Sequence, residues 1–180
     1  NRIGGIMITI DGGTGKIIHN GVNIAPAIMV NTWRINTTEI HEGTNNVITS
    51  NWEEIDNTGY GKMGSSLTNS SGVFSFPSTG IYYITSHWRF LIGTAPDSAA
   101  NVSMETTTDD STYTDANIIT VGDGSGSFTQ HASGDYVFDV ANTSTHKFRW
   151  RTHSFAGNSR LLGDSGENSS YFTVIRMADT

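Results

Sequence analysis

The sequence predicts an all-β domain built as an antiparallel sandwich, and three observations lead to this fold class. Ten short segments suit strands, and clusters of Gly, Ser, Asn and Asp separate them at the spacing of a sandwich or closed barrel. No window carries apolar residues at positions i, i+3, i+4 and i+7 over three helical turns. The chain is 36% hydrophobic and 15% charged, and the small polar residues that make up the difference favour strands and tight turns.

The expected strands place alternate side chains on opposite faces of a sheet. In the segment 81–90, Tyr82 and Trp88 share one face, whereas Tyr83 and Arg89 share the other. Large side chains on both faces indicate a second covered surface, which a subunit interface would supply. The expected strands are 27–30, 47–55, 72–76, 81–90, 101–107, 117–121, 127–131, 136–140, 147–153 and 171–177.

The first part of the chain differs from the rest, so we separate a short β stalk or linker, residues 1–25, from a domain of residues 26–180. Apolar residues alternate with others up to Ile10, a glycine-rich turn follows at 11–15, and a second short strand begins at Lys16. Two short hairpins cannot bury enough surface alone. They would be stable if wound around two copies of themselves, as in the stalk of a trimeric fibre, or if packed on the main domain.

Composition and charge exclude several function classes. The chain has 17 Asp and Glu against 10 Lys and Arg, a net charge of −7, and so lacks the basic surface that nucleic acids require. No apolar stretch approaches the ~20 residues that span a bilayer, so we expect no membrane insertion. Without Cys, the chain has neither disulfides nor thiolate metal sites.

Three patterns, in order along the chain, resemble the C1q/TNF superfamily over about residues 26–177. The segment 74–84 is similar to the family's aromatic stretch, short turn and G-x-Y strand. The segment 126–140 is similar to a hydrophobic strand, a Gly-Asp turn and an alternating strand, and 169–175 resembles the closing strand. The residues that carry these patterns are Phe74, Phe76, Gly80, Tyr82, Tyr83 and Ile84, then Phe128, Gly134, Asp135 and Val137, then Tyr171, Phe172, Val174 and Ile175.

This resemblance implies a jelly-roll β-sandwich of the C1q/TNF type that assembles as a homotrimer. Aligning Gly80 with the glycine of the G-x-Y strand sends Tyr82 and Ile84 into the sandwich. Phe172 and Val174 of the closing strand should turn inward beside them. The residues expected to face the threefold axis of the trimer are Tyr83, Thr85, His87 and Tyr171.

The style of the chain is similar to that of C1q-like heads at the tips of phage fibres and virion appendages. It is rich in Asn, Thr, Ser and Gly, its N-terminus looks stalk-like, and it has no Gly-X-Y collagen repeat. We expect a non-enzymatic head at a virion surface or outside the cell, partnered by other virion or appendage proteins, that attaches to a host-surface glycan or protein. The alternative is a structural component without a host ligand, and the third hypothesis is a hydrolase on a β-sandwich.

No cofactor is certain, and calcium is the ion that the residues suggest. Asp109, Asp110 and Asp115 offer hard oxygen ligands in the loop 106–115, and some C1q-like heads bind this ion. The alternative is a hydrated turn without a metal. The six His show neither H-x-H nor HExxH spacing, and a zinc site assembled from distant strands stays open.

Aromatic residues in loops are the expected ligand-binding residues. Trp and Tyr rings can stack on the C–H faces of sugars. Each candidate has the alternative role of an ordinary edge or core aromatic. The candidates are Trp33, Tyr60, Tyr113 and Phe155.

We expect no enzymatic activity. The turn 11–15 and Lys16 lack the first Gly and the final Ser or Thr of a phosphate loop. Glu53 and Glu54 are adjacent on an expected strand, so they point to opposite faces and cannot flank one substrate. No G-x-S-x-G motif occurs, and nothing selects a Ser/His/Asp triad.

Overall fold

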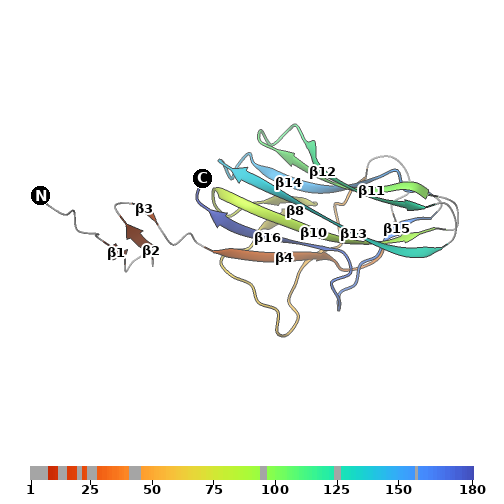
Figure 1. Ribbon diagram of the computed structural model, residues 1–180, viewed down its shortest axis with the longest axis horizontal. Helices are drawn as coiled ribbons and strands as arrows, with labels where there is room; N and C mark the ends of the chain where they lie inside the picture. The colour runs from red at the N-terminus through yellow and green to blue at the C-terminus, as the bar shows by residue number, and fades with distance from the viewer. Residues whose placement is uncertain are drawn as a thin grey trace, which may run out of the picture.

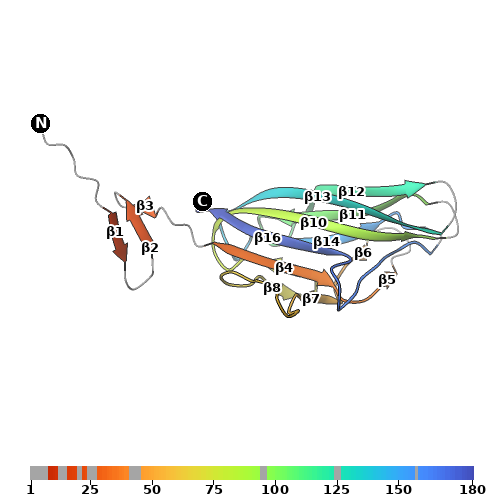
Figure 2. The ribbon, with the colours of Figure 1, turned by 60° about the horizontal axis from the view of Figure 1, so that its bottom comes forward.

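The computed structural model contains two β-sheets packed face to face, and a small third sheet near the N-terminus (Figure 1). It describes all residues except 1–7, 12–15, 20–21, 24–27, 41–45, 94–96, 124–126 and 157. Every described element is a strand and the named pairings are antiparallel, so the predicted all-β sandwich is confirmed. Figure 2 shows the strands of both layers running close to the long axis of the molecule.

The larger sheet has seven strands, which are β4 (Met29–Ile35), β5 (Glu39–Ile40), β7 (Trp52–Glu54), β10 (Gly80–Ile92), β13 (Phe128–Val140), β15 (Arg160–Leu161) and β16 (Tyr171–Ala178). Their order is β5-β15-β10-β16-β4-β7, and β13 also pairs with β10. β10 is long enough to pair with β16 in its first half and with β15 near its end. On its other side, β10 pairs with β13 along the whole length of both strands, and this is the longest ladder of the sheet.

The second sheet has six strands, which are β6 (Asn46–Val47), β8 (Thr68–Ser70), β9 (Val73–Ser75), β11 (Asp97–Thr107), β12 (Thr114–Asp123) and β14 (Lys147–His153). Their order is β12-β11-β14-β9-β8, and β6 pairs with β14 beyond the end of β9. β14 pairs with β6, β9 and β11, which come from distant parts of the chain, as in a jelly roll.

The core between the sheets is rich in aromatic rings. Trp88 of β10 meets Trp150 of β14 at a centroid distance of 4.8 Å, and Phe172 of β16 lies 4.9 Å from Phe74 of β9. Burial alternates along β10 and β16, because every second side chain enters this core. The predicted inward orientation is confirmed for Tyr82, Ile84, Phe172 and Val174, each at most 1% exposed.

The turn predicted at Gly134-Asp135 is wrong, because β13 runs straight through it. Gly134 pairs with Ser86 and Asp135 with Thr85 inside the ladder with β10. A Cβ at Gly134 would lie 2.8 Å from the side chain of Ile119 in β12. The glycine therefore makes room for a neighbouring strand, and the two predicted strands 127–131 and 136–140 are one.

Two other strand predictions need correction. The predicted strand 47–55 is two short strands in different sheets, because β6 pairs with β14 whereas β7 pairs with β4. Asn51, at φ 61°, lies between them. The predicted strand 27–30 corresponds to β4, which starts at Met29 and continues to Ile35.

The N-terminal segment contains β1 (Ile8–Asp11), β2 (Lys16–His19) and β3 (Val22–Asn23), which pair with one another. Figures 1 and 2 show this small sheet beyond the end of the sandwich at which β4 begins and the C-terminus lies. Most of the predicted turn at 11–15 falls outside the described residues, because 12–15 are not described. The division at residue 25 and the stalk stay predictions. Across the described parts of the chain, no helix has the length and apolar character needed to cross a membrane.

Candidate binding surface

The outward face of the larger sheet presents a row of apolar side chains across four strands. The register places Tyr83 of β10 opposite both Val137 of β13 and Ile175 of β16, and Ile175 opposite Val30 of β4. Paired residues on antiparallel strands point to the same face at about 5 Å. Val137 is 56% exposed and the other three are partly exposed, so this row is open to a partner.

A row of Thr follows the apolar row on the same face. Thr85 of β10 lies opposite Thr173 of β16, which lies opposite Thr32 of β4. The hydroxyl oxygens of Thr32 and Thr173 are 2.8 Å apart and share a hydrogen bond. Thr32 is only 4% exposed, so the accessible part of the row is Thr85 and Thr173, whose short side chains do not block the close approach of a partner.

A pair of His occupies the third row. His87 lies opposite Tyr171 of β16, with their ring centroids 5.7 Å apart. Its Nδ1 is 2.9 Å from the hydroxyl of Ser133, and its Nε2 is 3.1 Å from Nδ1 of His131. Burial, and then the nearby His131, lower the pKa of His87, so this imidazole is neutral at pH 7.

The four residues predicted to face a threefold axis thus share one sheet face. Tyr83, Thr85 and His87 are alternate residues of β10, and Tyr171 pairs with His87. Their part in a subunit interface stays a prediction.

Arg34 closes one side of this face. It belongs to the outward side of β4, yet it is only 1% exposed because two loops cover it. Its Nε donates to Glu53 at 2.9 Å, and its Nη1 donates to Asn57 at 2.5 Å. Its Nη2 also donates to the carbonyl of Ser165, and Nη1 approaches Asn168. No local pattern in the sequence marks this network, because its members come from three separate segments.

Two of the aromatic candidates belong to the sandwich itself. Trp33 lies in β4 and not in a loop, so that expectation is wrong; its Nε1 donates to Asn31, and its ring packs edge-on against Phe74. Phe155 is 3% exposed and stacks on Phe90 at 5.9 Å. Phe155 therefore offers no ring face to a ligand.

The other two aromatic candidates lie in loops, in different surroundings. Tyr113 precedes β12, and the guanidinium of Arg149 sits 4.0 Å from its ring centroid. Tyr60 lies between β7 and β8 and is partly exposed. The four candidates do not form one stacking platform, and sugar binding by Tyr60 or Tyr113 stays a prediction.

The three carboxylates suggested for calcium do not converge. Asp109 accepts hydrogen bonds from the backbone of Thr112 and Ser111, which lower its pKa. Asp110 pairs with Lys147 at 2.5 Å, and Asp115 accepts two bonds of 2.8 Å from Arg151. Within the described residues, no three His, Cys, Asp or Glu side chains are placed to hold a metal ion. The arrangement does not fit calcium.

Comparison with solved structures places this sheet pattern in a known fold. Murine APRIL at pH 5.0 superposes with a TM-score of 0.61 at 11% identity, covering 83% of this chain and 99% of that one. Eiger TNF from S. frugiperda gives a TM-score of 0.61 at 13% identity, covering 86% and 95% of the two chains. The chain has a TNF-like jelly-roll fold.

The likeness to TNF-like proteins concerns the fold, since the identities are so low. No protein-family model matches the chain, and the search of curated proteins finds no match. The structural matches confirm the predicted C1q/TNF-type sandwich. The function must be argued from this chain's own surfaces.

Proposed function

We propose that the protein is the non-enzymatic, homotrimeric head of an extracellular or virion appendage, which attaches to a host-surface ligand. The observation that carries the trimer is the exposed row of Tyr83, Val137 and Ile175 on the sheet face. In the TNF-like fold this sheet has the strands β4, β16, β10 and β13 side by side. A second and third copy of the chain are the occupants that we assign to this face.

The apolar row of the outward face is uncovered in the single chain. Singly exposed apolar residues are ordinary, but a row that spans neighbouring strands and includes Tyr83 marks an interaction site. Three copies of Tyr83 and Tyr171 would bury several hundred Å² of mostly apolar ring, worth on the order of 10 kcal/mol at ~25 cal/mol per Å² before the costs of association. His87, held neutral, adds no charge to the centre of such an interface.

Attachment is supported by the placement of the termini. The small N-terminal sheet, the start of β4 and the C-terminus lie at one end of the sandwich (Figures 1 and 2). A head that is tethered at this end presents its opposite end to a ligand. The alternative, a structural component without a host ligand, shares the trimer but not the ligand.

Two measurements test this proposal. Native mass spectrometry should give a complex of three 19.4 kDa chains; a monomer at micromolar concentration would contradict the trimer. An array of host-surface glycans and proteins should then show at least one saturable ligand. A trimer that binds nothing on such arrays favours the structural alternative, and turnover of a polysaccharide would favour the hydrolase.

A further inference from the structure

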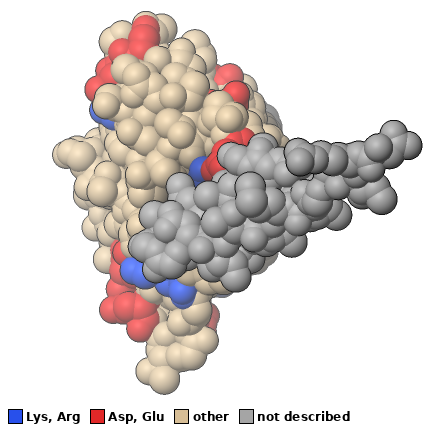
Figure 3. All heavy atoms as spheres, turned by 90° about the vertical axis from the view of Figure 1, so that its left-hand side faces the viewer, with Lys and Arg blue, Asp and Glu red and all other residues tan. Residues whose placement is uncertain are grey.

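Arg89 and Arg160 differ from the other basic residues of this acidic chain. Six of the eight Lys and Arg side chains that the structure describes pair with a carboxylate. Arg89 and Arg160 have no such partner among the described residues. Figure 3 shows the end of the molecule that carries the C-terminus, where basic groups lie beside acidic ones. The two unpaired arginines lie toward the other end.

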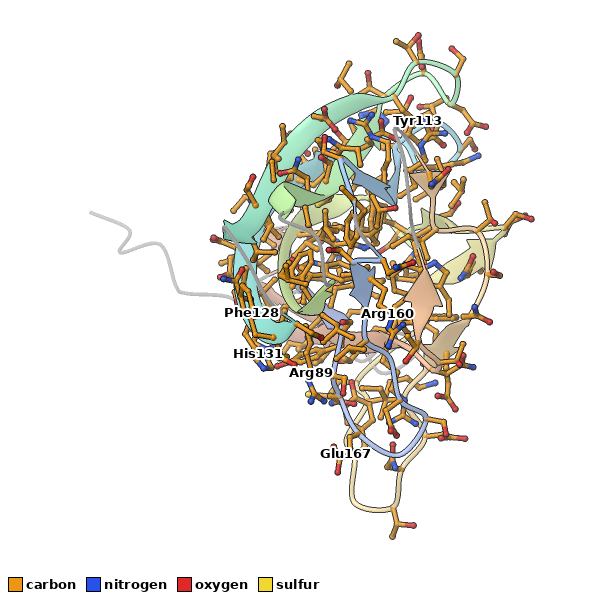
Figure 4. All side chains as sticks on the ribbon, turned by 90° about the vertical axis from the view of Figure 1, so that its right-hand side faces the viewer. Arg89, Tyr113, Phe128, His131, Arg160 and Glu167 are labelled. Carbon is orange, nitrogen blue, oxygen red and sulfur yellow. The ribbon has the colours of Figure 1, made fainter. Side chains whose placement is uncertain are left out.

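The sheet register brings these two arginines together. Arg89 is on the outward side of β10, directly opposite His131 of β13. Arg160 of β15 lies opposite Leu91, two residues further along β10 and on the same face. Diagonal neighbours of this kind are about 7–8 Å apart at their Cα atoms, so two long side chains can reach one ligand. Figure 4 shows Arg89 between His131 and Arg160.

Both guanidinium groups have unused donors. The Nε atoms of Arg89 and Arg160 are buried and have no hydrogen-bond partner among the residues that the structure describes. Arg89 makes one long side-chain contact, of 3.4 Å, to the hydroxyl of Ser169. A buried donor without an acceptor costs free energy, and a charged donor costs more. An acceptor that enters this site would recover that cost.

Asp164 and Glu167, two described acidic residues of this end, form no ion pair with Arg89 or Arg160. Asp164 accepts hydrogen bonds from the backbone of Gly166 and Glu167, and so caps its own loop. Glu167 lies on that loop, below Arg89 in Figure 4, and makes no ion pair within the described part of the chain. His131 is exposed and can add a further donor.

We propose that Arg89 and Arg160, with His131, form an oxyanion site that receives the sulfate or carboxylate group of an acidic host-surface sugar. The planar guanidinium donates two parallel hydrogen bonds to such groups, and two guanidinium groups can hold one anion from two sides. The inference rests on the proposed attachment function, because it names the chemical class of the ligand.

The location agrees with this assignment. Arg89 continues the row of Tyr83, Thr85 and His87 toward the end of the sandwich opposite the termini. In a trimer built on this face, three such sites would surround the axis at the free end. Their combined positive charge would favour a ligand with several acidic groups.

The test uses the full chain and two pairs of sugars. Calorimetry compares a sulfated oligosaccharide with its desulfated form, and sialyllactose with lactose, at constant ionic strength. One acidic sugar should bind at least about tenfold more tightly than its neutral counterpart. Arg89→Gln and Arg160→Gln should each lose this preference. Lys62→Gln is the control, because it removes a paired positive charge on an exposed side chain.

The outcomes separate this inference from the trimer. The pair of sugars that shows the preference identifies sulfate or carboxylate as the recognised group. Equal binding of acidic and neutral sugars in both pairs, or an equal loss in Lys62→Gln, overturns the oxyanion site. If the acidic sugar binds more tightly but the protein has the mass of a monomer, the oxyanion site is supported and the trimer is contradicted. A trimer without the preference overturns the site alone.

Discussion

Arg34 shows how one buried charge can order two loops. Its guanidinium bonds to Glu53, Asn57 and Ser165, which belong to segments on either side of β4. Arg34 is 1% exposed and Glu53 is 26% exposed, so removing the arginine takes the shared donor from all three acceptors and empties the buried space that its side chain fills. The loops over β4 therefore depend on this residue.

Replacing Arg34 tests this dependence. Arg34→Ala should lower the free energy of unfolding by about 3 kcal/mol, measured by urea denaturation. Lys62→Ala removes a pair whose Lys side chain is 45% exposed, so it should cost under about 1 kcal/mol. Equal costs for the two variants would show that the Arg34 network does not stabilise the fold.

The His pair makes stability depend on pH. Burial and His131 lower the pKa of His87, so the folded chain binds fewer protons than the unfolded chain below the ordinary value of about 6.5. His131 and Ser133 of β13 and Tyr171 of β16 face His87, with Arg89 beside it on β10. Asp135, two residues from Ser133 on the same face, is the nearest acidic position in the register. The contribution of His87 to the free energy of unfolding is therefore fully present above pH 6.5, and it decreases as the pH drops below this value.

Thermal unfolding between pH 7.5 and pH 5.5 checks this pH dependence. The melting temperature of the wild type should fall across this range, and His87→Gln should fall less. Burial, and then Arg151, also lower the pKa of His153, so His87→Gln keeps part of the slope and His153→Gln should remove a separate part. An unchanged slope in His87→Gln would contradict the assignment.

At the scale of strands, the sequence predicted those elements whose pattern is local. β14 has the predicted bounds, and β10 and β16 differ from prediction by two residues or fewer at either end. Their alternation of large apolar and polar residues is a property of neighbours along the chain. The glycine of the G-x-Y strand also has a clear cause, because a Cβ at Gly80 would lie 2.6 Å from the carbonyl oxygen of Ala178.

Contacts between distant segments could not be predicted in this way. Gly134-Asp135 has the composition of a turn, but its conformation is set by β12 and β10 on either side. The site residues Arg34, Arg89 and Arg160 carry no motif, and only the sheet register brings each to its partners or leaves it without one.

The fit of Gly134 against β12 gives a prediction for this element. Gly134→Ala should cost about 1–3 kcal/mol, because the added methyl group overlaps Ile119. Ile119→Ala, which removes both Cγ1 and Cδ1, should alone cost about 2–5 kcal/mol. In the double variant the methyl group no longer meets Ile119, so urea denaturation should show a cost below the sum of the two. Strict additivity would contradict this packing.

In the whole molecule, the outward face of the larger sheet is the surface that we assign to other copies of the chain. The face joins the apolar row at Tyr83 to the His pair and then to Arg89 along one strand. If three copies meet there, the interface, the pH dependence and the oxyanion site belong to one surface. If they do not, Tyr83 and Val137 are exposed apolar residues without a partner.

Light scattering at neutral pH on the wild type, Tyr83→Glu and Tyr83→Phe tests this claim most directly. The wild type and Tyr83→Phe should have about three times the 19.4 kDa mass of one chain. Tyr83→Glu should shift toward one chain while its circular dichroism stays that of a β-sandwich, because three carboxylates would meet in a poorly solvated interface. A wild-type mass near 19.4 kDa, or a Tyr83→Glu variant that stays fully trimeric, would contradict the proposed assembly.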